Sequence, residues 1–215
     1  MEKFLANSIY IGRGLGFVLQ LLGGGFLIGI IVGLLLSIFR YRKASVFLVE
    51  RFVSVIRGTP LILQLSFIYF SIPGICGIKM GVLSAGIIAF GINSSAYVSE
   101  ILRSGIESLP KGQFEAAQTL GIPKYYMWKD IILPQVITNV LPALVNEIIA
   151  LLKETALIAI IGGMDIMRRS QIIAAEQFEY FTPLCIAGVY YYFLVLLIEL
   201  VGKKIEKKQS DVKNP

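Results

Sequence analysis

The sequence predicts an all-α membrane protein in which five helices cross the bilayer. Hydrophobic residues make up 56% of the 215-residue chain and charged residues only 16%, whereas a typical soluble domain has about 25% charged residues. Residues 15–39 contain no charged residue, and this run exceeds the about 20 residues that an apolar helix needs to cross a bilayer. Lys and Arg residues gather at the ends of the apolar stretches, as they do in membrane proteins.

Glycines line one face of the first expected span, residues 15–39. Gly25, Gly29 and Gly33 recur at every fourth position, and such a ridge of small residues suits close packing against a neighbouring helix. We therefore expect this span to pack tightly on another helix.

The later spans contain helix-breaking residues at defined points. In the second span, residues 52–72, Gly58 adds backbone freedom and Pro60 lacks a backbone donor, so the helix is expected to begin twice or to bend there. Pro73-Gly74 is expected to end this span. The remaining spans are expected at residues 80–101, at residues 131–163 with a bend at Pro142, and at residues 181–201.

Two polar segments, residues 102–130 and 164–179, separate the later spans, and the second of them is expected to be a short helix. Thirteen Lys and Arg residues fall in the flanks at 40–51, 103–129 and 203–213 (four, four and five), and five fall in the opposite flanks. Because cytoplasmic flanks carry the excess of basic residues, we expect segment 102–130 and the carboxy terminus in the cytoplasm. The amino terminus and segment 164–179 are then expected outside.

Composition also excludes several functions. The formal net charge is +6, but basic residues at span ends do not indicate nucleic-acid binding. The chain has no histidine, which excludes histidine-based acid–base or metal chemistry, and Cys76 and Cys185 lack any metal or redox spacing. No Walker A pattern occurs, so the chain is not itself an ATPase. Residues 1–13 lack the pattern of a signal peptide.

The longest polar stretch, residues 113–135, is expected to form two short helices with a hinge. Residues 115–120 form a helical run, Gly121 suits a left-handed stop, and Pro123 prevents continuation. The residues that follow are aromatic and basic, a mixture typical of a membrane–water interface: Tyr125, Tyr126, Trp128 and Lys129.

This stretch resembles the EAA loop of ATP-binding cassette importer permeases. It matches the family's spacing at seven positions, and an ordinary amphipathic loop explains so many matches poorly. In that family the loop is a coupling helix that docks into a groove of a cytoplasmic ATPase. Small residues there allow close approach, and Leu120 and Ile122 would supply apolar contact. The matched positions are Glu115-Ala116-Ala117, Gly121, Ile131 and Leu133-Pro134, and the coupling residues implied are Glu115, Ala116, Ala117, Leu120, Gly121 and Ile122.

The resemblance implies the fold of a type I ATP-binding cassette importer permease, with five transmembrane helices and a cytoplasmic coupling helix in one domain over residues 1–215. It implies a non-catalytic subunit of the bacterial inner membrane without a cofactor of its own. ATP and Mg would bind a dimer of partner ATPase subunits, and an extracytoplasmic binding protein would deliver the substrate. One such subunit is too small to enclose a path, so a second permease, expected to be another copy, must pair with it.

Three spans carry polar residues at helical spacing, and these stripes are expected to meet around an interior site. A charged residue near the bilayer centre costs about 2.5–3.5 kcal/mol on insertion scales, so each needs a partner or a water-filled cavity. The stripes are Arg57, Leu61 and Gln64; Asn93, Tyr97 and Glu100; and Glu147, Ala150, Leu151 and Glu154.

Glu154 is the first candidate for a ligand contact, because the adjacent Lys153 points to another face of the helix. The other candidates also have structural readings. Glu100 can pair with Arg103 or Arg57, Glu147 can be satisfied by Asn146 or Lys153, and the amides can be interhelical contacts only. The candidate substrate-binding residues are Glu154, Asn93, Tyr97, Glu100, Gln64, Glu147 and Thr155.

Residues 57–64, 93–103 and 110–113 resemble permeases for polar amino acids. Residues 153–157 are similar to the acidic-Thr-Ser-Leu stretch of that subgroup, with Glu154 where Asp is commoner and Ala156 where Ser is usual. The acidic interior favours a cationic side chain, that of arginine, lysine or histidine. Because the α-amino group of any amino acid could occupy one carboxylate, glutamine or another polar amino acid is the alternative.

Proteins of other classes predict different behaviour. A channel or ion-coupled carrier has no use for a coupling loop and would transport without ATP. A membrane scaffold would treat each buried charge as structural, so that Glu154→Gln and Asn93→Ala would alter assembly alone. A membrane enzyme is least favoured, because the sequence offers no nucleophile–base pair or metal spacing.

Overall fold

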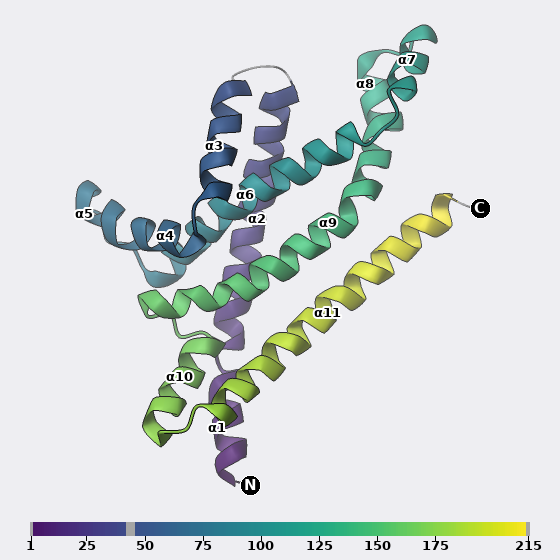
Figure 1. The fold of residues 1–215 in the computed structure, drawn as a ribbon. Coiled ribbons are helices and arrows are strands. Elements are labelled where there is room, and N and C mark those ends of the chain that lie inside the picture. Colours follow the sequence, from purple (N-terminus) through teal and green to yellow (C-terminus); the bar gives the residue numbers. More distant parts are fainter. Residues whose placement is uncertain (1, 42–45, 214–215) are drawn as a thin grey trace.

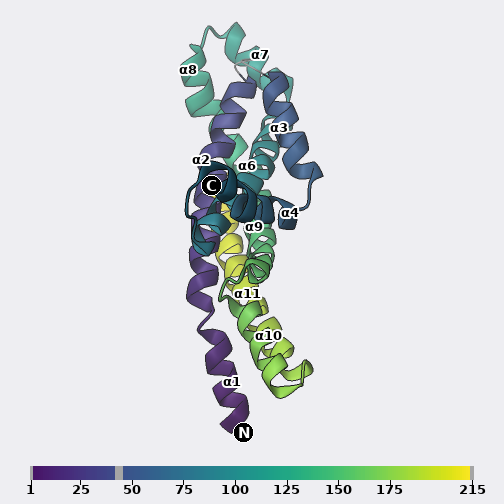
Figure 2. The same cartoon turned by 90° about the vertical axis from the view of Figure 1, so that its left-hand side faces the viewer.

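The computed structural model describes residues 2–41 and 46–213 and shows an elongated molecule built from helices (Figures 1 and 2). The described residues contain no strand, in agreement with the predicted all-α class. Arg42 and Lys43, which contribute to the basic flank after the first span, lie outside the described residues, as do the side chains of Lys208 and Lys213.

Three stretches of the described chain are long and apolar enough to cross a membrane. They are Glu2–Tyr41, which comprises α1 (Glu2–Gly12) and α2 (Leu15–Tyr41), then α6 (Val82–Glu107), and the Phe181–Lys207 part of α11 (Phe181–Lys213). They correspond to the first, third and fifth expected spans. α6 and α11 continue beyond the predicted ends at 101 and 201, and ion pairs such as Arg103–Glu107 stabilise the polar end of α6.

The second expected span is divided into short pieces. α3 (Val46–Gly58) ends before Pro60, which has an extended backbone, and the chain begins again in α4 (Leu61–Ser66), η1 (Phe67–Ser71) and α5 (Ile72–Cys76). The predicted second start at Gly58–Pro60 is confirmed. The predicted end at Pro73-Gly74 is wrong, because proline is tolerated in the first turn of α5 and the helix ends instead at Gly77, with φ 65°.

The fourth expected span begins earlier than predicted and changes its helical form before it ends. Helical structure starts in α8 (Lys124–Tyr126) and continues through η2 (Met127–Ile132) into α9 (Leu133–Glu154), which contains Pro142. The last stretch, η3 (Thr155–Ile161), is a 3-10 helix that ends at Gly162, with φ 87°. The fourth expected span therefore corresponds to α9 and η3. The second expected span corresponds to the run of helices from α3 to α5.

The glycine ridge of α2 packs directly on α6, as the sequence predicts. Gly25, Gly29 and Gly33 are all buried. A Cβ atom added at Gly29 would lie 2.7 Å from the Cβ and Oγ atoms of Ser94, closer than real Cβ atoms approach their neighbours. The two helix backbones can approach this closely only because these positions lack side chains.

The polar segments lie at opposite ends of the molecule (Figure 2). α7 (Lys111–Thr119) and α8 occupy one end, whereas α1 and α10 (Ile166–Gln177) occupy the other. The expected short helix in segment 164–179 is confirmed as α10, whose first turn is capped by the carboxylate of Asp165.

Candidate functional site

The α7 segment has the helix–stop–helix form that its sequence predicts. The helix ends at Leu120, and Gly121 adopts a left-handed conformation with φ 67°. The backbone N–H groups of Gly121 and Ile122 donate to the carbonyl oxygens of Gln118 and Ala117, each at 3.0 Å, which closes the helix end. Pro123 then precedes α8.

The candidate coupling residues divide between two faces of α7. Leu120 is 75% exposed, and Glu115, Ala116 and Gly121 are exposed with it. Ala117 is buried and Ile122 is half-buried, and both pack in a cluster of the chain's own apolar side chains. The small size of Ala117 therefore serves internal packing here, and Leu120, directly after α7, is an exposed apolar side chain.

In the interior, the polar stripes of α6 and α9 meet as expected. The Asn93 amide donates to a carboxylate oxygen of Glu154 at 3.5 Å, and the Ser94 hydroxyl donates to Glu147 at 2.7 Å. The sequence missed Ser94 as the partner of Glu147. The signal available was the uninterrupted run of small polar residues at 93–95, each of which is buried.

The stripe of the second expected span joins this seam only in part. The Gln64 amide group donates to the carbonyl oxygens of Ile56 and Thr59, at 2.8 and 3.2 Å, and so bridges the break between α3 and α4. The expectation that Gln64 meets the other stripes is wrong, because local backbone carbonyl groups freed at the break take its donors. Arg57 does reach α6, where its guanidinium lies 5.3 Å from the centre of the Tyr97 ring.

The neighbours of Glu154 on the chain point elsewhere. Lys153 is exposed, and the ion pairs of the described residues do not include it. The suggested pairing with Glu147 is therefore not seen in the described part of the chain. Thr155 is buried, and its hydroxyl donates to the Leu152 carbonyl at 2.6 Å, so this hydroxyl is already used within the helix end.

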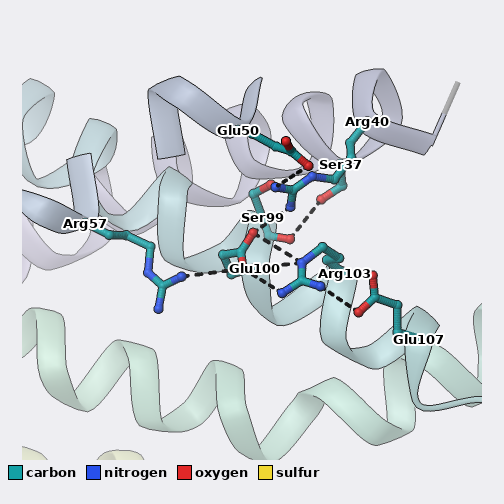
Figure 3. Close-up of polar contacts among 8 residues, drawn as sticks. All are labelled: Ser37, Arg40, Glu50, Arg57, Ser99, Glu100, Arg103 and Glu107. Carbon is teal, nitrogen blue, oxygen red and sulfur yellow. Dashed lines mark hydrogen bonds and ion pairs between the residues drawn. The ribbon is translucent and has the colours of Figure 1, made fainter. Parts of the chain in front are cut away.

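Glu100 is the centre of an ion-pair network at the α7 end of α6 (Figure 3). Its carboxylate pairs with Arg103 at 2.9 Å and with Arg57 at 3.5 Å, as the structural reading expected, and also with Arg40 of α2. The sequence did not predict the pairing of Arg40 with Glu100, because it shows only that Arg40 follows the first span and not which helix lies beside it. The network joins α2, α3 and α6 through a single carboxylate whose side chain is 18% exposed.

Removing the Glu100 charge is expected to loosen this end of the molecule. In Glu100→Gln, three arginines lose their common partner, and breaking a buried ion pair costs about 3–5 kcal/mol. Since the Arg57 and Arg103 side chains are 44% and 39% exposed, solvent reduces the loss, and we expect about 2–3 kcal/mol. Thermal unfolding of the purified protein in detergent measures the change.

Glu50→Gln is the matched control, because the Glu50 side chain is 57% exposed and its carboxylate lies 3.9 Å from Arg40. We expect a change of less than about 0.5 kcal/mol from it. Equal melting temperatures for the two variants would contradict the central role of Glu100.

Comparisons with known proteins agree on the family of the chain. The family model described as "Binding-protein-dependent transport system inner membrane component" matches residues 25–211. The chain is 48% identical over 208 residues, covering 96% of this chain and 95% of the relative, to a putative glutamine transport system permease protein GlnP of Rickettsia typhi. It is 42% identical over 201 residues, covering 93% and 92%, to the arginine transport system permease protein ArtQ of Bacillus subtilis.

Solved structures give the same picture of the fold. The chain is similar to a protein described as an amino acid ABC transporter with histidines, at a TM-score of 0.88 and 34% identity over 96% of this chain and 97% of that one. A structure of the MetNI methionine ABC transporter in an inward-facing conformation matches at a TM-score of 0.74 and 22% identity, over 93% and 95% of the two chains.

Proposed function

The chain belongs to the family of inner-membrane components of binding-protein-dependent transport systems, and from this premise we propose that it carries basic amino acids, arginine, lysine or histidine, across the membrane. It is an amino-acid permease subunit with the type I importer fold.

One observation supports a cationic substrate. Glu147 and Glu154 of α9 face α6, where their partners are the uncharged side chains of Ser94 and Asn93. Neither carboxylate takes part in the ion pairs of the described residues. A carboxylate inside a membrane protein needs a cation, a donor or water, and a substrate with a charged side chain as well as an α-amino group supplies two cationic groups.

Glutamine is the competing substrate, and a relative supports it: the 48% identical permease is named for glutamine and the 42% identical one for arginine. Glutamine offers a single cationic group, its α-amino group, so one of the two carboxylates would meet only neutral donors, among them the side-chain amide of the ligand. The pair of carboxylates therefore favours the basic amino acids.

The remaining proposals concern assembly. A dimer of cytoplasmic ATPase subunits would dock on the exposed face of α7, where Glu115, Ala116, Leu120 and Gly121 lie. A second copy of this chain would complete the path, and a binding protein would deliver substrate to the α10 end. With segment 102–130 in the cytoplasm and segment 164–179 outside, ATP binding and hydrolysis on the ATPase subunits docked at α7 would rock the helices around the seam of α6 and α9.

The test is a comparison of substrates on the assembled transporter. Reconstituted complexes should hydrolyse ATP faster with arginine, lysine or histidine than with glutamine when the binding protein is present. Citrulline, which has nearly the shape of arginine but an uncharged side chain, is the matched ligand and should stimulate ATP hydrolysis no more than glutamine does. Stimulation by glutamine or citrulline equal to that by arginine would refute the basic specificity and keep the permease.

A further inference from the structure

A polar cavity lies between α6 and α9, nearer to α7 than the Asn93–Glu154 contact is. Its volume is about 410 Å³. Arg57, seen beside Glu100 in Figure 3, lines it from α3. The other polar residues that line it are Tyr97, Glu100, Arg103, Ser104, Ser108 and Asn139.

This cavity continues the seam of the candidate substrate site. On α6, positions 93, 97, 100 and 104 share one face, which Ser108 continues directly after the helix, and on α9 positions 154, 147, 143 and 139 share another. The two faces meet at Asn93 and Glu154 at one end and, through the Asn139 amide that donates to the Ser108 hydroxyl at 3.3 Å, at the other. One seam therefore joins two polar sites.

The charges of the cavity suit a different part of an amino acid from those of the first site. The first site offers two carboxylates, whereas this cavity offers the guanidinium groups of Arg57 and Arg103 and one carboxylate, that of Glu100. The Arg57 side chain is 44% exposed, and its guanidinium nitrogen lies 3.5 Å from the Glu100 carboxylate oxygen. This distance is longer than the nitrogen–oxygen distance of about 2.7–2.9 Å in a strong charged hydrogen bond. Planar guanidinium groups recognise carboxylates with two parallel hydrogen bonds.

We propose that this cavity is a second binding site, which holds the α-carboxylate of a free amino acid on Arg57 and its α-amino group on Glu100. The identity of the ligand rests on the proposed function, and the proposed orientation places the cavity on the cytoplasmic side. A ligand held here lies between α3, α6 and α9. Because alternating access requires these helices to move relative to one another, occupancy from the cytoplasm slows the transport cycle.

The experiment uses liposomes in which the ATPase subunits face outward and the binding protein with saturating arginine is enclosed. Arginine, glycine or agmatine, which is arginine without its carboxylate, is then added outside with ATP. Arginine and glycine should inhibit ATP hydrolysis, and agmatine should need a concentration at least about tenfold higher. In Arg57→Gln the concentration of arginine that halves this variant's own uninhibited rate should be about tenfold higher than the corresponding concentration for wild type.

Arg51→Gln is the matched control, because Arg51 lies on the same helix, is exposed, and stacks on Phe47 at 5.1 Å without lining the cavity. It should leave the inhibition unchanged. Arg57→Lys, which keeps the charge beside Glu100 but not the planar fork, should assemble and still weaken the inhibition. Equal inhibition by agmatine and arginine, or equal effects of Arg57→Gln and Arg51→Gln, would overturn the proposal.

A direct measurement separates this proposal from the proposed function. Radiolabelled glycine should bind the complex in the absence of the binding protein, should be displaced by arginine but not by agmatine, and should bind about tenfold more weakly to Arg57→Gln. This result depends on no transport. If enclosed glutamine stimulates ATP hydrolysis and enclosed arginine does not, the proposed basic specificity is refuted, and glycine binding still tests the second site. If glycine does not bind, the second site alone is refuted.

Discussion

Glu154→Gln is expected to abolish the stimulation of ATP hydrolysis by arginine at concentrations that saturate the wild-type complex. The substitution keeps the size of the side chain and its contact with Asn93 but removes the charge that would meet a cationic ligand. Hydrogen bonds to charged groups contribute about 1.5–3 kcal/mol, which corresponds to about 10- to 100-fold weaker binding. Titration of arginine against ATP hydrolysis and uptake measures the shift.

Lys153→Gln is the control for this variant. Lys153 is adjacent in sequence but exposed, and neighbouring helix positions do not share a face, so we expect its arginine titration to match that of wild type. A melting temperature for Glu154→Gln equal to wild type would show that the loss concerns the ligand. If Glu154→Gln transported arginine normally, Glu154 would be a structural residue and the basic specificity would lose its main support.

Gly29→Val is expected to disrupt the packing of α2 on α6. A Cβ atom at Gly29 would lie 2.7 Å from Ser94 and 3.4 Å from its backbone carbonyl carbon, so the helices must separate. Overpacking of this kind costs about 1–3 kcal/mol, and we expect a loss near the upper end, about 3 kcal/mol, because the Cβ atom of Ser94 is attached to the backbone of α6 and cannot rotate away. Thermal unfolding in detergent measures this change.

The same substitution should also disturb the seam of α6 and α9, because the Ser94 hydroxyl donates a hydrogen bond to Glu147. Gly23→Val is the matched control: it lies on the same helix, and a Cβ atom there would meet nothing within 4 Å. We expect it to retain the wild-type melting temperature and arginine response. Similar destabilisation by both variants would mean that α2 tolerates no added side chain for reasons unrelated to α6.

Features set by local chemistry could be predicted from the sequence, and features set by distant contacts could not. The break at Gly58–Pro60, the stop at Gly121 and the glycine ridge of α2 each depend on residues within one or two helical turns. The meeting of the α6 and α9 stripes followed from the need of buried polar groups for partners. The Arg40–Glu100 pair joins residues 60 positions apart, and only the packing of α2 on α6 brings them together.

Two further misses have physical reasons of their own. The amide of Gln64 was expected in the interior, but carbonyl groups left free by the broken helix were nearer and took its donors. The fourth span was expected to continue to residue 163 with a bend at Pro142, and instead its last seven helical residues, Thr155–Ile161, form a 3-10 helix. Hydrophobic periodicity does not distinguish these two helical forms over so short a stretch.

The 3-10 segment η3 begins directly after Glu154 and lies between this residue and α10. Its seven residues, Thr155–Ile161, rise about 2.0 Å each, against about 1.5 Å in an α-helix, so a change to α-helical form would shorten it by about 3.5 Å. Because the two forms have about 3.0 and 3.6 residues per turn, the same change would turn its ends by about 140° relative to each other. In such a change, Glu154 and α10 would move closer together and rotate relative to each other at the same time, because both movements follow from the same change of helical form.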